Sequence, residues 1–193
     1  MRKKLKNSFL IFIMTILIGC SNLKFEKSSD VVFNGRNLKI GDILIKRKGV
    51  DILSWFGHSG IIVSENMVGD IPKLGEKYYE TNIEEWTKDN RDIIILRYKN
   101  IDEKFQKELL KDLNNYKNKY YKLNFNKNNT KGFYCSQIIW YLYKDVSIKN
   151  NNEIDLDSDR GIIVFPYDFI KSHQLKKVEI HRIKKGRNDE KKF

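Results

Sequence analysis

Cysteine is almost absent from this chain. Its 193 residues include two cysteines, Cys20 near the N-terminus and Cys135 in an apolar segment. If Cys20 carries lipid, Cys135 is the remaining free thiol and no internal disulfide is possible. A lone free cysteine in an exported protein needs an explanation, and nucleophilic catalysis is one.

Histidine is nearly as scarce, with three residues in the whole chain. His173 and His181 lie in a polar, basic C-terminal stretch, so we expect them at the surface. His58 lies in the most glycine-constrained stretch of the sequence, Gly57-His58-Ser59-Gly60. Glycine in a strand often marks a close approach to the backbone, and the segment that carries Cys135 is the expected neighbour. His58 is therefore the expected partner of a reactive thiol, and a purely structural histidine is the alternative.

Several functional classes lack support. No second block of composition indicates a second domain, and no aromatic and basic motif indicates a nucleic-acid partner. The acidic run at 155–159 fails as a calcium loop, because Arg160 occupies the glycine position and Pro166 the glutamate position. We expect a solvated loop there, with no metal and no other cofactor. The oligomeric state stays open.

The N-terminus has the pattern of a secretory signal. Basic residues at 2–6 precede an apolar run, Phe9 to Ile18, which is too short to span a membrane comfortably. Its ending, Leu17-Ile18-Gly19-Cys20, is similar to a bacterial lipobox. We expect a signal peptide at 1–19, lipid on Cys20, and an exported, membrane-anchored lipoprotein of the cell envelope. The alternative is an uncleaved N-terminal anchor.

After the signal we expect a lipidated cysteine and tether at 20–36, one domain at 37–183 and a charged tail at 184–193. The net charge of +12 is spread along the chain, so a basic surface facing anionic lipid or wall polymer is plausible. Apolar patterning predicts an α+β domain. Strands are expected at 31–33, 38–45, 55–63, 77–82, 92–98 and 177–183, and helices at 83–89 (or a turn), 102–121, from about 134, and 166–172.

The segment around Cys135 has helical periodicity. Cys135, Ile138, Ile139 and Leu142 follow an i, i+3, i+4, i+7 pattern, and Thr130 or Asn129 is a candidate cap. A cysteine in the first turn of a helix lies near unpaired backbone N–H groups, which favour thiolate. The alternative is a small apolar residue inside the core.

His58 and a polar partner are expected on neighbouring strands. Period-2 alternation puts His58, Gly60 and Ile62 on one face of a strand. In the strand at 77–82, Tyr78, Glu80 and Asn82 share a face. A thiol, a histidine and a polar group that orients the imidazole are the parts of a cysteine nucleophile site.

Together these segments resemble the circularly permuted papain-like branch of the NlpC superfamily, and YiiX-like hydrolases in particular. The resemblance covers about residues 38–170. It implies an α+β fold in which a small antiparallel sheet or barrel packs against a nucleophile-bearing helix. The motifs that carry it are Gly41-Asp42-Ile43-Leu44, Gly57-His58-Ser59-Gly60-Ile61, Tyr79-Glu80, Phe133-Tyr134-Cys135-Ser136 and Phe165-Pro166-Tyr167-Asp168.

The resemblance also implies roles for individual residues. Cys135 would be the nucleophile, His58 the general base and Glu80 the group that orients His58. Asn82 is an alternative to Glu80, because amides also serve in this role. Tyr134 would line the oxyanion site beside the Cys135 backbone N–H, and Tyr78 would line the substrate.

Two functions follow as hypotheses. The first is an exported, membrane-anchored cysteine hydrolase that cleaves an amide or ester bond through an acyl-enzyme. Its substrate would be lipid- or acyl-linked, with a peptidoglycan-derived peptide as the other possibility. The second is a non-catalytic surface lipoprotein that binds a wall fragment, lipid or host molecule.

Overall fold

The structure is a computed structural model that describes residues 24–34, 37–51 and 54–180. The predicted signal peptide, Cys20 and the charged tail lie outside these residues. The described helices are α2 (Ser28–Asn34), α3 (Ile83–Trp86), α4 (Glu103–Asn114), α5 (Cys135–Lys149) and α6 (Pro166–Lys171). The strands are β1 (Ile43–Lys46), β2 (His58–Ser64), β3 (Met67–Asp70), β4 (Tyr79–Asn82), β5 (Ile93–Tyr98) and β6 (Leu175–Lys177). None of the described helices combines the length and apolar character needed to cross a membrane.

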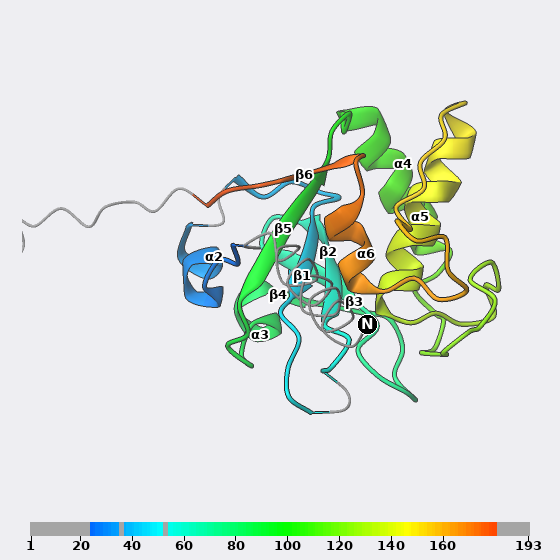
Figure 1. Ribbon diagram of the computed structural model, residues 1–193. Coiled ribbons are helices and arrows are strands. Elements are labelled where there is room, and N and C mark those ends of the chain that lie inside the picture. The colour runs from blue at the N-terminus through cyan, green and yellow to red at the C-terminus, as the bar shows by residue number, and fades with distance from the viewer. Residues whose placement is uncertain (1–23, 35–36, 52–53, 181–193) are drawn as a thin grey trace, which may run out of the picture.

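The strands form one antiparallel sheet in the order β4-β3-β2-β1-β5-β6. It is an open sheet, so the barrel alternative is not the form adopted. The expected α+β architecture is present, with the sheet packed against the helix that begins at Cys135 (Figure 1).

Alternation along the strands divides the apolar residues between two cores. Ile43, Ile45 and Ile61 face the larger core with α4 and α5, whereas Leu44 and Ile62 face a smaller core. In Figure 1, α4, α5 and α6 lie on one side of the sheet and α2 and α3 on the other. The residues of both cores, and those packed against them, lie between Phe25 and Ile180. The chain after Cys20 therefore contains all of this packing.

Helices α4 and α5 differ in how much of their surface is buried. α4 is amphipathic and is capped by Asp102, whose side chain accepts a hydrogen bond of 2.7 Å from the Phe105 amide. It ends at Asn114, earlier than predicted, and residues 119–122 instead pair with Glu76, Tyr78 and Phe133. α5 is mostly buried, and its N-cap is Tyr134 rather than Thr130 or Asn129.

The sequence predictions for the N-terminal segment and for one hairpin were wrong. Residues 31–33, predicted as a strand, belong to α2, and Val31 is fully buried in the smaller core. β3 was not predicted. It pairs with β2 across a tight turn in which Asn66 has a φ of 60°, a conformation that asparagine tolerates better than most residues.

The Gly41-Asp42 motif is structural. Gly41 has a φ of 89°, which favours glycine, and its carbonyl accepts a hydrogen bond from the Tyr143 hydroxyl of α5. The Asp42 carboxylate is fully buried and accepts two hydrogen bonds of 2.7 Å from the Arg97 guanidinium. This bidentate ion pair joins the start of β1 to β5.

Candidate active site

Cys135 is the first residue of α5. The preceding residue, Tyr134, has an extended backbone (φ −109°, ψ 168°) and is the N-cap. The thiol therefore lies in the first turn of the helix, where backbone N–H groups have no intrahelical partner. The partial positive charge there favours a thiolate. Cys135 is partly exposed rather than sealed in the core.

His58 is the first residue of β2 and contacts a carboxylate on the neighbouring strand. Its Nε2 donates a hydrogen bond of 2.5 Å to Oδ2 of Asp70, the last residue of β3. The side chains of His58 and Asp70 are 14% and 1% exposed. Because Nε2 is occupied by Asp70, Nδ1 is the ring nitrogen left for the thiol.

The thiol and the imidazole are close enough to change each other's protonation. Burial alone would lower the pKa of His58, but the charges of Asp70 and Cys135 and their hydrogen bonds outweigh it and raise that pKa to about 10. Burial likewise opposes ionisation of Cys135, yet the charge and hydrogen bond of His58 bring the pKa of the thiol below its ordinary value. The two shifts together favour a thiolate–imidazolium pair.

Trp86 in α3 supports the carboxylate and covers the imidazole. Its indole Nε1 donates a hydrogen bond of 2.9 Å to the same Asp70 oxygen that His58 contacts. Its ring stacks on the His58 ring at 6.0 Å between centroids. The ammonium of Lys46 lies 4.1 Å from the centroid of the Trp86 ring. Asp70 is thus held from two sides.

Gly60 makes room for this arrangement. A Cβ at Gly60 would lie 2.5 Å from Val68 and 3.0 Å from the Trp86 ring. The glycine therefore serves a close approach, as predicted for a strand glycine. The neighbour was expected to be the cysteine helix, but it is Trp86, which belongs to the opposite core.

The carboxylate that contacts His58 is Asp70 rather than Glu80. Glu80 accepts a hydrogen bond of 3.0 Å from the Tyr78 hydroxyl and pairs with Lys117 at 2.7 Å. Asn82, the alternative, caps α3 by accepting a hydrogen bond of 2.7 Å from the Glu85 amide. Glu80 and Asn82, the two candidates on the predicted face of β4, therefore have hydrogen-bond partners other than His58.

The two predicted tyrosines are buried near these groups. The Tyr134 hydroxyl accepts a hydrogen bond of 2.9 Å from the Val164 amide, and burial raises its pKa to about 12. Tyr78 is bonded to Glu80, and burial raises the pKa of its phenol as well. Cys20, the predicted lipid attachment point, lies outside the described residues.

A cleft borders the site on the side of His58 and Asp70. Its volume is about 650 Å³, and its lining mixes apolar and charged side chains. Trp86, Tyr79 and Val50 supply apolar surface. The lining also carries charge of both signs, and Lys46 and Arg91 are both paired with Asp89. The cleft therefore offers apolar surface to a ligand and has no excess of positive charge.

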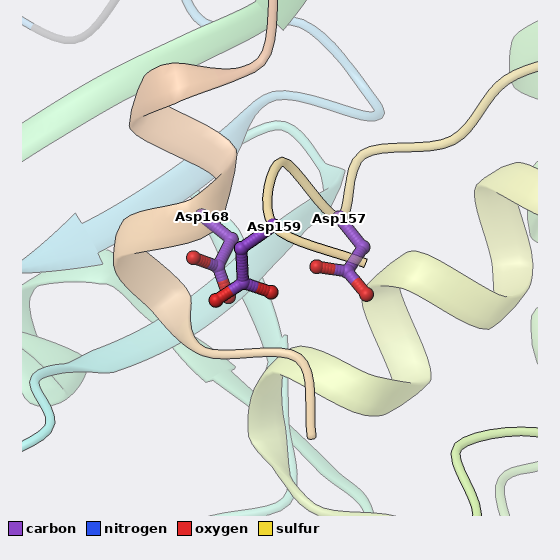
Figure 2. A group of neighbouring side chains, drawn as sticks. All are labelled: Asp157, Asp159 and Asp168. Atoms are coloured by element: carbon purple, nitrogen blue, oxygen red, sulfur yellow. The ribbon is translucent and has the colours of Figure 1, made fainter. Parts of the chain in front are cut away.

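Three carboxylates gather beside α6 (Figure 2). Oxygens of Asp157, Asp159 and Asp168 lie within 4.8 Å of one another. Asp168 in α6 is buried, and Asp157 is buried together with Ile154 and Leu156, so the loop at 150–160 is less solvated than expected. Asp157 already pairs with Lys127, and the three carboxylates accept hydrogen bonds from the amides of 160, 161 and 165. Lys127 supplies one positive charge to this group of three carboxylates, and the amide donors are neutral.

Comparison with protein families identifies the fold. A model of the permuted papain-like amidase enzymes, the YaeF/YiiX or C92 family, matches residues 27–179. The chain belongs to this family. It is therefore a papain-like amidase or hydrolase by family, in agreement with the resemblance recognised from its motifs.

A solved structure shares the C92 fold. The chain is similar to a crystal structure described as metalloprotein yiiX from Escherichia coli O157:H7, with a TM-score of 0.58 and 15% sequence identity. The alignment covers 74% of this chain and 97% of that one. The comparison with curated proteins gives no match.

Sequence reasoning missed two residues of this candidate site. Asp70 ends a strand that was not predicted, and Trp86 lies in a four-residue helix. One signal was available for Asp70. The Glu65-Asn66 pair is a turn sequence between two apolar runs, and a hairpin there returns Asp70 to the start of β2.

Proposed function

We propose that this protein is a cysteine hydrolase that cleaves an amide or ester bond through an acyl-enzyme, with Cys135 as nucleophile, His58 as general base and Asp70 as the residue that orients His58. The observation that carries the proposal is the position of His58, which is hydrogen-bonded to Asp70 through Nε2 and is close enough to Cys135 to hydrogen-bond with the thiol. A thiol, an imidazole and a carboxylate in this series make up a cysteine nucleophile site.

The proposed reaction has two steps. In the first, the Cys135 proton resides on His58 and the thiolate sulfur attacks the substrate carbonyl. The bond to the leaving amine or alcohol then breaks, and His58 donates its proton to the leaving group. In the second, water gives a proton to His58 and attacks the thioester, which releases the acid and returns the proton to the sulfur. The Cys135 backbone N–H is a candidate donor to the oxyanion, beside Tyr134.

Asp157, Asp159 and Asp168 are the described residues that would hold a cation, and no step proposed here uses them. Lys127 and backbone amides already serve the carboxylates of Asp157, Asp159 and Asp168. The description of the similar E. coli structure as a metalloprotein applies to that protein. The steps proposed for this chain use its thiol, imidazole and carboxylate alone.

Trp86 is proposed as a positioning residue for Asp70. Trp86→Phe keeps the ring against His58 but removes the indole N–H, so kcat/KM is expected to fall about 10- to 150-fold, which corresponds to the cost of one hydrogen bond to a charged group, about 1.5 to 3 kcal/mol. The Asp70 oxygen would lose one of two donors, and the pH–rate profile should shift with it. A purely structural role would lower the unfolding temperature and leave the pH profile in place.

The proposed substrate has an acyl group. Trp55 and Phe56 precede His58 and are 61% and 54% exposed, and Tyr79 borders the cleft with Trp86. These apolar side chains suit an acyl chain. We further propose that lipid on Cys20 holds the mature protein at the outer face of a membrane, near such substrates.

A chain beginning at Ser21 tests this proposal, because it contains both cores. It should hydrolyse an N-acyl amino acid or acyl ester faster than a wall-derived stem peptide, and mass spectrometry after rapid acid quenching should find the acyl group on Cys135. Turnover of wall peptides alone would reverse the substrate preference and keep the thiol mechanism. Binding of these ligands without turnover would favour a non-catalytic lipoprotein.

A further inference from the structure

Exposed apolar side chains gather at one end of the molecule. Nine of the ten large apolar residues that are exposed within the described part of the chain lie on segments next to the active site. We call these segments the rim: residues 47–51, 54–57, 71–79, 115–134 and 158–165. The nine side chains are Val50, Trp55, Phe56, Leu74, Tyr79, Tyr120, Leu123, Phe125 and Ile162, and the exception is Ile148 near the end of α5.

The topology explains why these segments meet. β2, β4, α5 and α6 begin at this end of the fold, and β3 ends there, so the connecting segments surround His58, Asp70 and Cys135. Residues 119–122 are hydrogen-bonded to 76–78 and to Phe133, two residues before the thiol. In Figure 1 the segments lie toward the lower end, where α5 starts.

The rim segment at 115–134 is also strongly basic. It contains five lysines and no acidic residue, although acidic residues are common elsewhere in the chain. Two of its lysines pair with Glu80 and Asp157. Lys122 and Lys131 are exposed, and Leu123 and Phe125 beside them are 50% and 67% exposed. Lys77 lies 4.9 Å from the ring centroid of Tyr120 in the same region.

From these observations we propose that the rim docks on the surface of a bilayer that contains anionic lipid, with Leu123 and Phe125 inserted among the headgroups. Exposed apolar patches on a soluble domain mark interaction surfaces, and apolar side chains flanked by lysine suit the membrane interface. Exposed lysines close to a membrane surface, such as Lys122 and Lys131 would be, are attracted to anionic headgroups. An anionic wall polymer would use the lysines but not the apolar side chains.

Docking in this orientation turns the start of α5 toward the lipid. A substrate with its acyl chain in the bilayer would then reach Cys135 without leaving the membrane completely. This consequence rests on the proposed hydrolase function, whereas docking itself does not.

The test measures vesicle binding by the chain that begins at Ser21, which has no lipid anchor. It should co-sediment with vesicles of phosphatidylcholine and phosphatidylglycerol and much less with phosphatidylcholine alone. Leu123→Ser/Phe125→Ser and Lys122→Glu/Lys131→Glu should each weaken binding about 10-fold or more, since they remove insertion and charge attraction respectively. Matched controls are Ile148→Ser and Lys104→Glu/Lys107→Glu, which change exposed residues away from the rim.

Four outcomes would overturn the proposal. These are no preference for anionic vesicles, equal losses in the controls, binding that depends on the lysines alone, or a rim-dependent dimer in solution with no vesicle binding. The lysine-only result would point to a wall polymer, and the dimer to a second copy of the chain. Cys135→Ala should bind vesicles like the wild type, so failure of docking and failure of catalysis are separable.

Discussion

Cys135→Ala should abolish hydrolysis, a loss of at least about 10⁴-fold in kcat, because the proposed acyl-enzyme forms on the sulfur of Cys135, the one cysteine among the described residues. His58→Ala should cost nearly as much, since the thiol would lose its base and the leaving group its acid. Steady-state rates on an acyl-amide substrate measure both. Circular dichroism and thermal unfolding of each variant control for folding. If Cys135→Ala keeps activity within 10-fold of the wild type, the thiol mechanism is wrong.

The pH dependence of thiol alkylation tests the same pair without a substrate. The pKa of Cys135 lies below its ordinary value and that of His58 is raised to about 10. The pKa of a free cysteine is about 8.5, and an ordinary thiol loses reactivity below that pH. Iodoacetamide should therefore label Cys135 at a pH well below about 8.5. Hydrolysis should decline as pH rises through about 10, because His58 then loses the proton it gives to the leaving group.

His58→Ala provides the matched comparison. Without the imidazolium, burial is left to raise the pKa of the thiol, so labelling should shift to higher pH. An unchanged labelling profile in this variant would mean that the helix terminus alone activates Cys135. Normal labelling of the wild type combined with no turnover of any substrate would favour the binding lipoprotein.

The elements with strong apolar periodicity could be predicted from the sequence. β1 and β5 contain continuous apolar runs, α4 has a helical apolar period, and the alternation in β2 separates Ile61 from Ile62 as expected. Cys135 could be found because a cysteine is rare here, and His58 because the other histidines have polar surroundings. The order of the motifs then sufficed to recognise the family.

The third member of the site could not be predicted in this way. β3 has four residues and includes glycine and aspartate, which are poor strand formers, so its local signal is weak. Its position is decided by the hairpin turn at Asn66 and by pairing with β2, which are tertiary effects. Glu80 satisfied the expected chemistry and lay on a better strand pattern, but its register in β4 pairs it with Gly69 rather than bringing it to His58.

Trp86 was missed for a related reason. Its helix has four residues, which is too short for a periodic signal. The role of Trp86 follows from its tertiary contacts. Its ring packs against Gly60, its Nε1 donates to Asp70, and the ammonium of Lys46 lies over its ring. The glycine gave a correct hint of close packing, but sequence alone does not show which side chain fills the space.

Asp70→Ala should show which of the two candidate carboxylates, Asp70 or Glu80, orients His58. We expect kcat/KM to fall by roughly 10² to 10⁴-fold, since the imidazole would lose the acceptor that fixes its tautomer and stabilises its charge. Asp70→Asn should fall less, because an amide oxygen can still accept from His58. Glu80→Ala removes an ion pair with Lys117 on a partly exposed strand and should remain within about 2-fold of the wild type.

The pH profile distinguishes orientation from folding in these variants. Asp70 is a main source of the raised pKa of His58, so in Asp70→Ala the decline of activity at high pH should begin well below 10. Removing this buried acceptor also leaves Trp86 Nε1 unpaired, which costs about 1 to 3 kcal/mol of stability, so rates must be measured below the unfolding transition. A large loss in Glu80→Ala with little change in Asp70→Ala would return the orienting role to Glu80.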